Sequence, residues 1–376
     1  MDIKDYSAGT YKKGYEYKYF IPTKINHPFI WSDASINELL EKASLKMGEL
    51  DSFSRFVPNT NLFIMMHVFK EAVISSRIEG TRTNIEEALI DETELDPEKR
   101  DDWQEVRNYV EAMNFALKKL STLPLSNRLI RKTHKILLSK GRGKHKNPGE
   151  FRKSQNWIGG VSLSDAVFIP PAHIELPDLL TDFELFLHNQ TLKVPHLVKI
   201  AIAHYQFETI HPFLDGNGRI GRLIITLYLV SNGILEKPLL YLSDYFDKNK
   251  SLYYDNLSFV RTKNDLGQWI KFFLTGIIQT AAASVATLKR ITDLKKSLEN
   301  DRILLMGRRS KPALTFLNEL FSYPVVTIKE VQNITGLSPK AANDLVKVFM
   351  EYNILVEITG QSRNRRFIFK DYVDMF

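Results

Sequence analysis

Three glycines and two arginines interrupt the chain between two apolar segments. The sequence HPFLDGNGRIGR, residues 211–222, lies between LVKIAIAHYQFETI and LIITLYLV, which both have the apolar content of buried helices. Glycine costs about 1 kcal/mol relative to alanine inside a helix, so this cluster predicts a loop between two helices. A solvated linker is the simpler alternative, but a linker does not need a histidine, an aspartate and two arginines beside its glycines. We therefore expect a binding loop.

Helical periodicity dominates the rest of the chain. Apolar residues recur every three or four positions in long segments such as 32–53, 61–80 and 266–300. The exception is the stretch from Pro148 to Pro171, where two short apolar runs flank a Gly-Gly turn and predict a β-hairpin at about 156–169. Its free edges could pair with an extended peptide, and a surface hairpin without a partner fits equally well. We expect a mainly α fold.

The composition changes near residue 300 and indicates a domain boundary. Beyond it the sequence predicts three helices followed by two strands around a Gly/Ser/Asn turn, which is the order of a winged helix-turn-helix domain. The expected domains are an N-terminal helical region over 1–100, a helical core over 101–299 and the winged helix-turn-helix domain over 300–376.

Composition sets broad limits on function. The 51 basic and 44 acidic residues give a net charge of +7, which allows contact with a polyanion but is too small to indicate one. The absence of cysteine excludes disulfides and thiolate metal sites and fits a reducing compartment. The first residues lack the apolar segment of a secretory signal, and purely apolar runs are far shorter than a membrane span. We expect a cytoplasmic protein with no membrane partner.

The loop at 211–222 offers the groups that a bound polyphosphate needs. If the second helix begins within the GNG triplet, its N-terminus and the glycine amides face the same anion. Arg219 and Arg222 share one face of that helix and suit two successive phosphates. Asp215 is a candidate ligand for Mg²⁺, which is often held by one carboxylate plus substrate phosphates. His211 is the one group in the loop that accepts a proton near neutral pH.

These residues resemble the signature of the Fic family, HxFx(D/E)GNGRxxR, at every specified position. Fic proteins are mainly adenylyltransferases, nucleotidyltransferases that move AMP from ATP to a Ser, Thr or Tyr hydroxyl of a protein and release pyrophosphate. The resemblance implies a Fic catalytic core over 101–299, ATP as substrate, Mg²⁺ as cofactor and a target protein as partner, for which the chain itself is one candidate. It also places the hairpin at the position of the family's flap, which aligns the target segment by main-chain pairing.

The resemblance implies a role for each matched residue. His211 would deprotonate the target hydroxyl, Phe213 would anchor the loop in the core, and Asp215 would bind Mg²⁺. Tyr253 and Tyr254, in the segment YYDNL, resemble the family's aromatic contact near adenine, although paired aromatic residues on a helix more often belong to the core. The phosphates would be bound as follows: α and β by Gly216, Asn217 and Gly218, with help from Arg219, and γ by Arg222.

A second pattern precedes the core. EAVISSRIEGTR, residues 71–82, ends a helical segment, with Ser75 and Glu79 on one face and Gly80 as a plausible C-terminal cap. Alone, the pair fits an ordinary solvated face. Beside this loop it resembles the family's inhibitory pattern (S/T)xxxE(G/N), which implies that Glu79 pairs with Arg222 and blocks placement of the γ-phosphate. The resemblance leaves open the reverse reaction, in which Glu79 orients a water that removes AMP from a modified target.

The C-terminal region suggests an alternative function, a DNA-binding regulator. Arg363, Arg365 and Arg366 of the expected wing could reach phosphates, but the expected recognition helix carries only Lys340 and Lys347 as basic groups. DNA is therefore not favoured, and we place dimerisation or substrate docking slightly ahead, which leaves a homodimer compatible with the sequence. A kinase or NTPase is disfavoured because no GxxxxGK(S/T) sequence occurs.

Several other residues are expected to be structural. The histidines in helical patterns are expected to pack or to lie at the surface rather than to bind ligands, and Arg152 is expected to shape the start of the hairpin. These histidines are His134, His196 and His204. Trp103 and Trp269 are expected to lie in the core.

Overall fold

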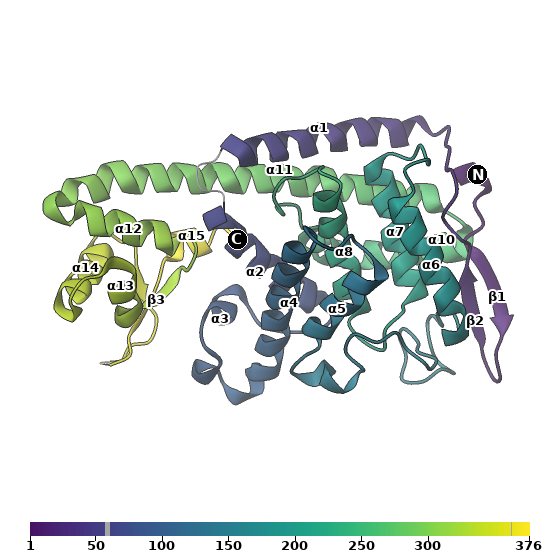
Figure 1. Ribbon diagram of the computed structural model, residues 1–376, viewed down its shortest axis with the longest axis horizontal. Helices are drawn as coiled ribbons and strands as arrows, with labels where there is room; N and C mark the ends of the chain where they lie inside the picture. The colour runs from purple at the N-terminus through teal and green to yellow at the C-terminus, as the bar shows by residue number, and fades with distance from the viewer. Residues whose placement is uncertain (57–60, 362) are drawn as a thin grey trace.

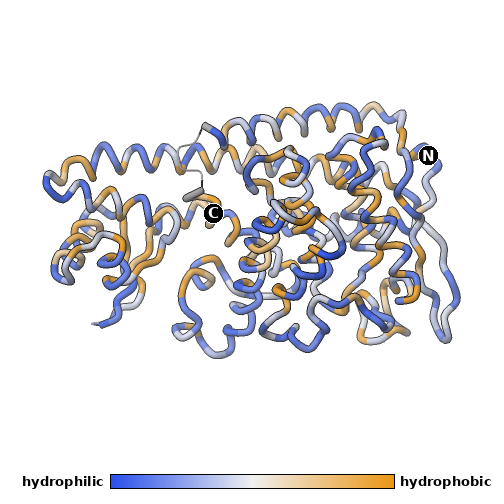
Figure 2. Tube along the Cα trace, viewed as in Figure 1, coloured by the Kyte–Doolittle hydropathy of each residue, from blue (hydrophilic) through white to orange (hydrophobic). Residues whose placement is uncertain are grey.

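Two long helices run side by side along the molecule. In the computed structural model, which describes residues 1–56, 61–361 and 363–376, α1 (Ala34–Phe56) packs along α11 (Leu266–Leu298). Figure 1 shows α11 extending beyond α1 toward the C-terminal region. Orange and blue alternate along both helices in Figure 2, as expected of helices with one buried face. Helices make up 63% of the chain, so the prediction of a mainly α fold is confirmed.

The centre of the molecule is built around α7 (His196–Ile210) and α8 (Asn217–Ser231). Most residues of both helices are buried, because α7 and α8 are apolar nearly all round and are enclosed by other helices. The helices that surround them are α2 (Asn61–Ile78), α4 (Arg100–Lys119), α5 (Asn127–Leu137), α6 (Leu176–His188), α9 (Ser243–Lys248), α10 (Lys250–Lys263) and α11. Trp269 is fully buried on α11, and Trp103 is buried on α4, as predicted.

The predicted hairpin at 156–169 forms only a single β-bridge, between Ile158 and Phe168. Asp165 explains the short pairing, because its carboxylate accepts hydrogen bonds from the backbone amides of Val161 and Ser162 and so holds the intervening residues in a turn. We call residues 156–169 the flap segment. The prediction of a hairpin is therefore correct in place and wrong in extent.

A two-stranded sheet that the sequence reading missed lies beside the flap segment. It pairs β1 (Gly9–Lys13) with β2 (Lys18–Pro22) in antiparallel register. The amide of Phe20 on β2 donates to the carbonyl of Ile169, at a distance of 3.0 Å. The N-terminal strands therefore support the end of the flap segment.

The C-terminal region contains the predicted helices and strands together with one further strand, β3, and one further short helix, α15. The helical path from α11 continues as a π-helical turn over Glu299–Ile303 and a 3-10 segment over Leu304–Arg309. The three strands form an antiparallel sheet in the order β3-β5-β4. Ser362, in the expected turn, lies outside the described residues. The elements are α12 (Ser310–Leu320), β3 (Val325–Thr327), α13 (Ile328–Thr335), α14 (Pro339–Glu351), β4 (Val356–Glu357), β5 (Arg366–Ile368) and α15 (Lys370–Val373).

The C-terminal region contacts the segment that follows α2. Arg366 forms ion pairs with Asp91 and Glu94, and Lys370 pairs with Glu86. Arg365 pairs with Glu357 of the neighbouring strand. Two of the three arginines expected to reach phosphates are therefore held by carboxylates instead.

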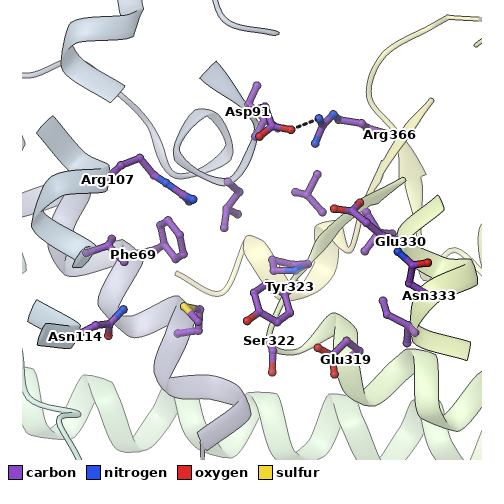
Figure 3. A pocket seen from close by; sticks show the side chains of 18 of the residues that line it. Phe69, Asp91, Arg107, Asn114, Glu319, Ser322, Tyr323, Glu330, Asn333 and Arg366 are labelled. Carbon is purple, nitrogen blue, oxygen red and sulfur yellow. Dashed lines mark hydrogen bonds and ion pairs between the residues drawn. The ribbon is translucent and has the colours of Figure 1, made fainter. Parts of the chain in front are cut away.

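A cavity of about 590 Å³, partly open to solvent, lies between the C-terminal region and the helices α2, α3 (Ile85–Leu89) and α4. Figure 3 shows Arg107 and Phe69 on one side of this cavity and Tyr323 and Glu330 on the other. The lining includes no residue of the loop at 211–222.

One helical stretch is apolar enough to be compared with a membrane span. Residues Leu266–Leu320 include an 18-residue window of mean hydropathy 1.3, which meets the length and composition of a span. Half of that window is buried inside the protein, and Trp269 and Phe273 lie in its core. Because core helices of globular proteins have the same composition, the window is weak evidence for a span.

Candidate functional site

The loop between α7 and α8 begins and ends in left-handed backbone. His211 follows α7 with φ 49° and ψ 60°, and Gly216 precedes α8 with φ 75°. A Cβ atom at Gly216 would lie 3.4 Å from Leu137, so glycine suits both the backbone angle and the close packing. The second helix begins at Asn217, within the GNG triplet as predicted, and the N-terminus of α8 faces the loop.

Phe213 and Asn217 hold the loop in shape. Phe213 is fully buried, and its ring stacks on His134 with the centroids 3.7 Å apart. The side-chain oxygen of Asn217 accepts from the Phe213 amide at 2.8 Å, and its side-chain nitrogen donates to the Phe213 carbonyl at 2.9 Å. The expected anchoring role of Phe213 is present. The Asn217 side chain is used within the loop, which leaves only its backbone amide for a phosphate.

His134 is a packing residue, as expected, and it also braces the loop. Its Nδ1 accepts from the Gly149 amide at 2.8 Å, which places the proton on Nε2, and Nε2 then donates to the Asp215 carbonyl at 2.9 Å. Burial lowers the pKa of His134 to about 4, so the ring is neutral at pH 7.

Arg152, which precedes the flap segment, and Asn156, at its start, hold the backbone of the loop in place. Arg152 is 2% exposed, and its Nε donates to the His211 carbonyl at 2.9 Å. The Asn156 side chain donates to the Phe213 carbonyl at 2.9 Å. Burial lowers the pKa of Arg152 to about 10, because its partners are carbonyl groups rather than carboxylates. The sequence reading assigned Arg152 only to the shape of the hairpin and missed Asn156, since isolated residues carry no pattern.

His211 has one nitrogen engaged and one available. Its Nδ1 lies 3.2 Å from the backbone carbonyl of Glu208, a contact that favours the proton on Nδ1 and leaves Nε2 as an acceptor. Burial lowers the pKa of His211 to about 4, so the imidazole is unprotonated at pH 7. His211 therefore has the protonation state of a general base.

Arg222 is bound to the helix that carries the second sequence pattern. Its Nε donates to the Ser75 hydroxyl at 2.8 Å, and its Nη2 donates to the Ser75 carbonyl at 2.8 Å and to Glu79 Oε1 at 2.7 Å. Burial alone would raise the pKa of Glu79 and lower that of Arg222. The charge of each partner outweighs burial, so the pKa of Glu79 is lowered and that of Arg222 is raised. The contact implied by the resemblance is present.

Glu79 lies over the first turn of α8. It follows the last residue of α2 and precedes Gly80, whose φ is +106°. A Cβ atom at Gly218 would lie 2.3 Å from Glu79 Oε1 and 3.0 Å from Arg222 Nη1. The carboxylate therefore occupies space that only a glycine leaves open, at a helix terminus that favours an anion.

Arg219 does not share a partner with Arg222. Its Nη1 donates to Glu105 of α4 at 3.1 Å, its Nη2 lies 3.7 Å from Asp215, and its side chain is 3% exposed. Glu105 also accepts from Arg142 at 2.7 Å. Each buried guanidinium is held by a carboxylate from a different part of the chain. The grip of both arginines on successive phosphates therefore stays a prediction, and it requires these ion pairs to open.

Asp215 remains open enough to bind a cation. Its side chain is 42% exposed, and its Oδ1 accepts from the Gly216 amide at 2.6 Å. Among the described residues, no group of three or more His, Asp or Glu side chains is arranged to hold a metal. A single carboxylate still suits Mg²⁺ when substrate phosphates complete the shell, so Asp215 fits the predicted role.

The two tyrosines of α10 lie in different surroundings. Tyr253 is 2% exposed, its hydroxyl lies 2.9 Å from His204 Nε2, and its ring stacks on Phe246. The ring and the hydroxyl are both used in the core, so the contact of Tyr253 with adenine stays a prediction without support from its surroundings. Tyr254 is 43% exposed and stays a candidate contact. Burial, followed by the charge of Glu79, raises the pKa of Tyr254 to about 12.

The other two histidines are structural, as expected. His204 is fully buried, and its Nδ1 lies 3.1 Å from the Gly221 carbonyl. His196 lies 2.8 Å from the Tyr228 hydroxyl.

Two family models match the chain. The model described as "Fic/DOC family N-terminal" matches residues 37–118, and the model described as "Fic/DOC family" matches residues 124–229. The second match contains the whole loop at 211–222, and the first contains Ser75, Glu79 and Gly80.

Curated relatives match shorter stretches. A protein named "Protein adenylyltransferase Fic" from Aedes aegypti is 34% identical over 129 residues, which cover 33% of this chain and 22% of that protein. The protein of the same name from Drosophila erecta is 40% identical over 86 residues, or 23% of this chain and 16% of that protein. The chain thus spans less than a quarter of the length of either relative.

Solved structures show the same fold over more of the chain. A Fic family protein from Desulfovibrio desulfuricans has a TM-score of 0.58 at 21% identity and covers 91% of this chain and 98% of its own. A Fic domain containing signaling protein from Bacteroides thetaiotaomicron has a TM-score of 0.53 at 18% identity, with 68% and 97% covered. At these identities the likeness concerns the fold alone.

Proposed function

This chain is a Fic/DOC family protein, and from that premise we propose that it transfers AMP from ATP to a Ser, Thr or Tyr hydroxyl of a protein. One observation carries the proposal. The unprotonated His211 precedes a helix N-terminus whose first turn already holds a carboxylate. A base and an anion site side by side are what the transfer of a phosphate-linked group requires.

The chemistry follows from the roles of these residues. The target hydroxyl oxygen attacks the α-phosphorus of ATP, the bond from that phosphorus to the oxygen leading to the β-phosphate breaks, and pyrophosphate leaves. The hydroxyl proton passes to His211 Nε2, since Nδ1 faces the Glu208 carbonyl. The backbone amides at the start of α8 stabilise the charge on the phosphates. Asp215 would hold Mg²⁺, which neutralises phosphate charge when bound.

Glu79 acts as an inhibitor in this proposal. Its carboxylate lies against Arg222 and over Gly218, where the outer phosphates of ATP would bind. Because one carboxylate neutralises the arginine meant for the γ-phosphate, ATP cannot be placed productively until Glu79 moves away.

The C-terminal region gives less support to a DNA-binding function. Arg365 and Arg366 are paired with carboxylates, and only Arg363 of the three wing arginines is without an ion pair among the described residues. A phosphate backbone would have to displace these carboxylates before binding.

The test is the search for AMP on protein. Glu79→Gly and Glu79→Gly/His211→Ala are incubated with Mg-ATP and a cell lysate, and the proteins are analysed by mass spectrometry. GTP, UTP and CTP serve as competitors. We expect an AMP adduct with the first variant and none with the second. If Glu79→Gly leaves neither itself nor any lysate protein with a nucleotide-derived mass, the proposal fails.

A further inference from the structure

Positive charge is concentrated in one part of the chain. The 38 residues 112–149 contain ten of the 51 basic residues and none of the 44 acidic ones. Eight of the ten lie on α5 and in the loop that follows it, between 128 and 146. Such segregation has a physical consequence, because like charges that are not neutralised nearby create a positive potential at the surface.

Two of these eight cations are used inside the protein, and six are not. Arg131 pairs with Glu150, and Arg142 pairs with Asp102 and Glu105. The other six are exposed, and none of them forms an ion pair with any residue that the structure describes. We call them the basic strip: Arg128, Lys132, Lys135, Lys140, Lys144 and Lys146.

The first half of the basic strip is a helix face. Arg128, Lys132 and Lys135 are spaced i, i+4 and i+7, so they line the outer side of α5. The opposite side of α5 is buried and includes Ile130 and His134. The strip continues into the loop at 140–146, where Lys144 and Lys146 are exposed.

The basic strip and the candidate active site are two sides of one structural unit. On the inner side of α5, His134 binds the Asp215 carbonyl at 2.9 Å. A Cβ atom at Gly143, in the middle of the following loop, would lie 3.4 Å from Asp215 Oδ2. Arg142 reaches Glu105, which in turn holds Arg219. The strip is therefore positioned next to the catalytic loop by rigid contacts.

The flap segment contacts the backbone of the same loop. Arg152 and Asn156 connect it to the backbone at His211 and Phe213, and the side chains of Val161 and Val167 are exposed. A protein that offers a hydroxyl to the site across the flap is thereby brought close to the basic strip.

From these contacts we infer that the basic strip is a docking surface for an acidic segment of the target protein, near the hydroxyl that is modified. The inference rests on the proposed function for its substrate and adds the charge of that substrate. Complementary charge speeds the encounter and selects among partners, most strongly at low salt. Nucleic acid is the less favoured occupant, because residues 128–149 contain no Phe, Tyr or Trp on which a base could stack.

The test uses the full chain with Glu79→Gly and a set of three peptides. Each peptide is made in three versions, with Ser, Thr or Tyr as the central residue that carries the hydroxyl. The peptides differ in four flanking residues, all Glu, all Gln or all Lys. Binding is measured by fluorescence anisotropy and adenylyl transfer as kcat/KM. We expect the Glu peptides to bind and to react about tenfold better than the Gln peptides at low salt, with the gap closing at about 0.5 M salt.

Strip variants add the matched control. Lys132→Glu/Lys135→Glu/Lys144→Glu should reverse the preference, and the same three positions changed to Gln should remove it, which guards against misfolding caused by charge reversal. Lys311→Glu/Lys329→Glu/Lys347→Glu, three exposed and unpaired lysines of the described C-terminal region, should leave the preference unchanged.

The outcomes separate the two proposals. Equal use of all peptides, or an equal effect of the control triple, overturns the docking surface. Labelled duplex DNA that binds wild type and not the strip variant, with indifferent peptides, assigns the strip to nucleic acid and overturns it as well. Charge-selective binding without any transfer supports the strip and rejects the proposed function. Adenylyl transfer without charge preference supports the proposed function and rejects the strip as a docking surface.

Discussion

Glu79 Oε1 lies 2.7 Å from Nη2 of Arg222, across 143 residues of sequence. Replacing Glu79 with Gly removes the only carboxylate paired with this arginine among the described residues. We expect incorporation of AMP to rise about tenfold or more, because couplings between two sites are typically about 1–3 kcal/mol, which corresponds to roughly 5- to 150-fold. Intact mass after incubation with Mg-ATP measures it. Glu79→Gln tests charge at constant size, and equal incorporation by wild type and both variants would reject the inhibitory role.

Ser75→Ala should loosen the same arginine more mildly. The variant loses the hydroxyl that accepts from Arg222 Nε, while the Ser75 carbonyl and Glu79 remain. We expect a loss of about 1–2 kcal/mol in the free energy of unfolding, and AMP incorporation between those of wild type and Glu79→Gly. Ser76→Ala is the matched control, because Ser76 is equally buried and its hydroxyl has no partner in the described part of the chain. Equal losses in both variants would contradict the prediction.

The pH dependence of transfer should report a histidine with a low pKa. Burial lowers the pKa of His211 to about 4, so its base form is complete well below neutral pH. In the Glu79→Gly background the rate should change less than about twofold between pH 5.5 and 7.5 through this group, and it should fall only toward pH 4. Removing Glu79 takes away a negative charge that raises this pKa, so the midpoint moves no higher. A midpoint near 6.5, the value of a free histidine, would show that His211 is solvated instead.

The buried Glu71 makes stability depend on pH. Burial raises its pKa to about 7, although Ser243 and Tyr109 donate hydrogen bonds to it. A raised pKa means that the folded protein holds the proton where the unfolded chain releases it, so stability is lost as pH rises from about 4.5 through 7. Urea unfolding at pH 5 and 8 should show wild type losing about 2 kcal/mol more than Glu71→Gln. The same pH dependence in both proteins would show that Glu71 is already ionised at pH 5.

The two neighbouring tyrosines should separate stability from nucleotide binding. Tyr253→Ala removes a fully buried ring and should lower the free energy of unfolding by about 3 kcal/mol. Tyr254→Ala should leave stability within about 1 kcal/mol of wild type and should raise the KM for ATP in the Glu79→Gly background. Thermal unfolding and initial rates at varied ATP distinguish these effects. An unchanged KM for Tyr254→Ala would remove this residue from the site.

Features set by neighbouring residues were predictable from the sequence. The end of α7 and the start of α8 follow from the position of the glycines, and the end of α2 follows from Gly80. The pairing of Glu79 with Arg222 was predictable only through a family pattern, because no local rule connects residues 143 positions apart.

Contacts between distant elements were not predictable. Glu105 as the partner of Arg219, and Asn156 as a support of the loop, depend on how α4 and the flap segment pack against α8. Tyr253 and Tyr254 are neighbours on one helix, and their side chains leave the helix axis in directions about 100° apart. Sequence alone does not tell which of the two faces the core when both are aromatic.

The missing side chain at position 218 has a consequence for how the protein responds to its surroundings. The hollow left there is filled by the Glu79 carboxylate, and a triphosphate that settled at the start of α8 would need the same volume. The carboxylate and the triphosphate cannot occupy this volume at the same time, so each weakens the binding of the other by the same factor. The fraction of molecules with a triphosphate at the start of α8 then rises with the nucleotide concentration. A partner that binds Glu79 elsewhere would lower the nucleotide concentration that this occupancy requires.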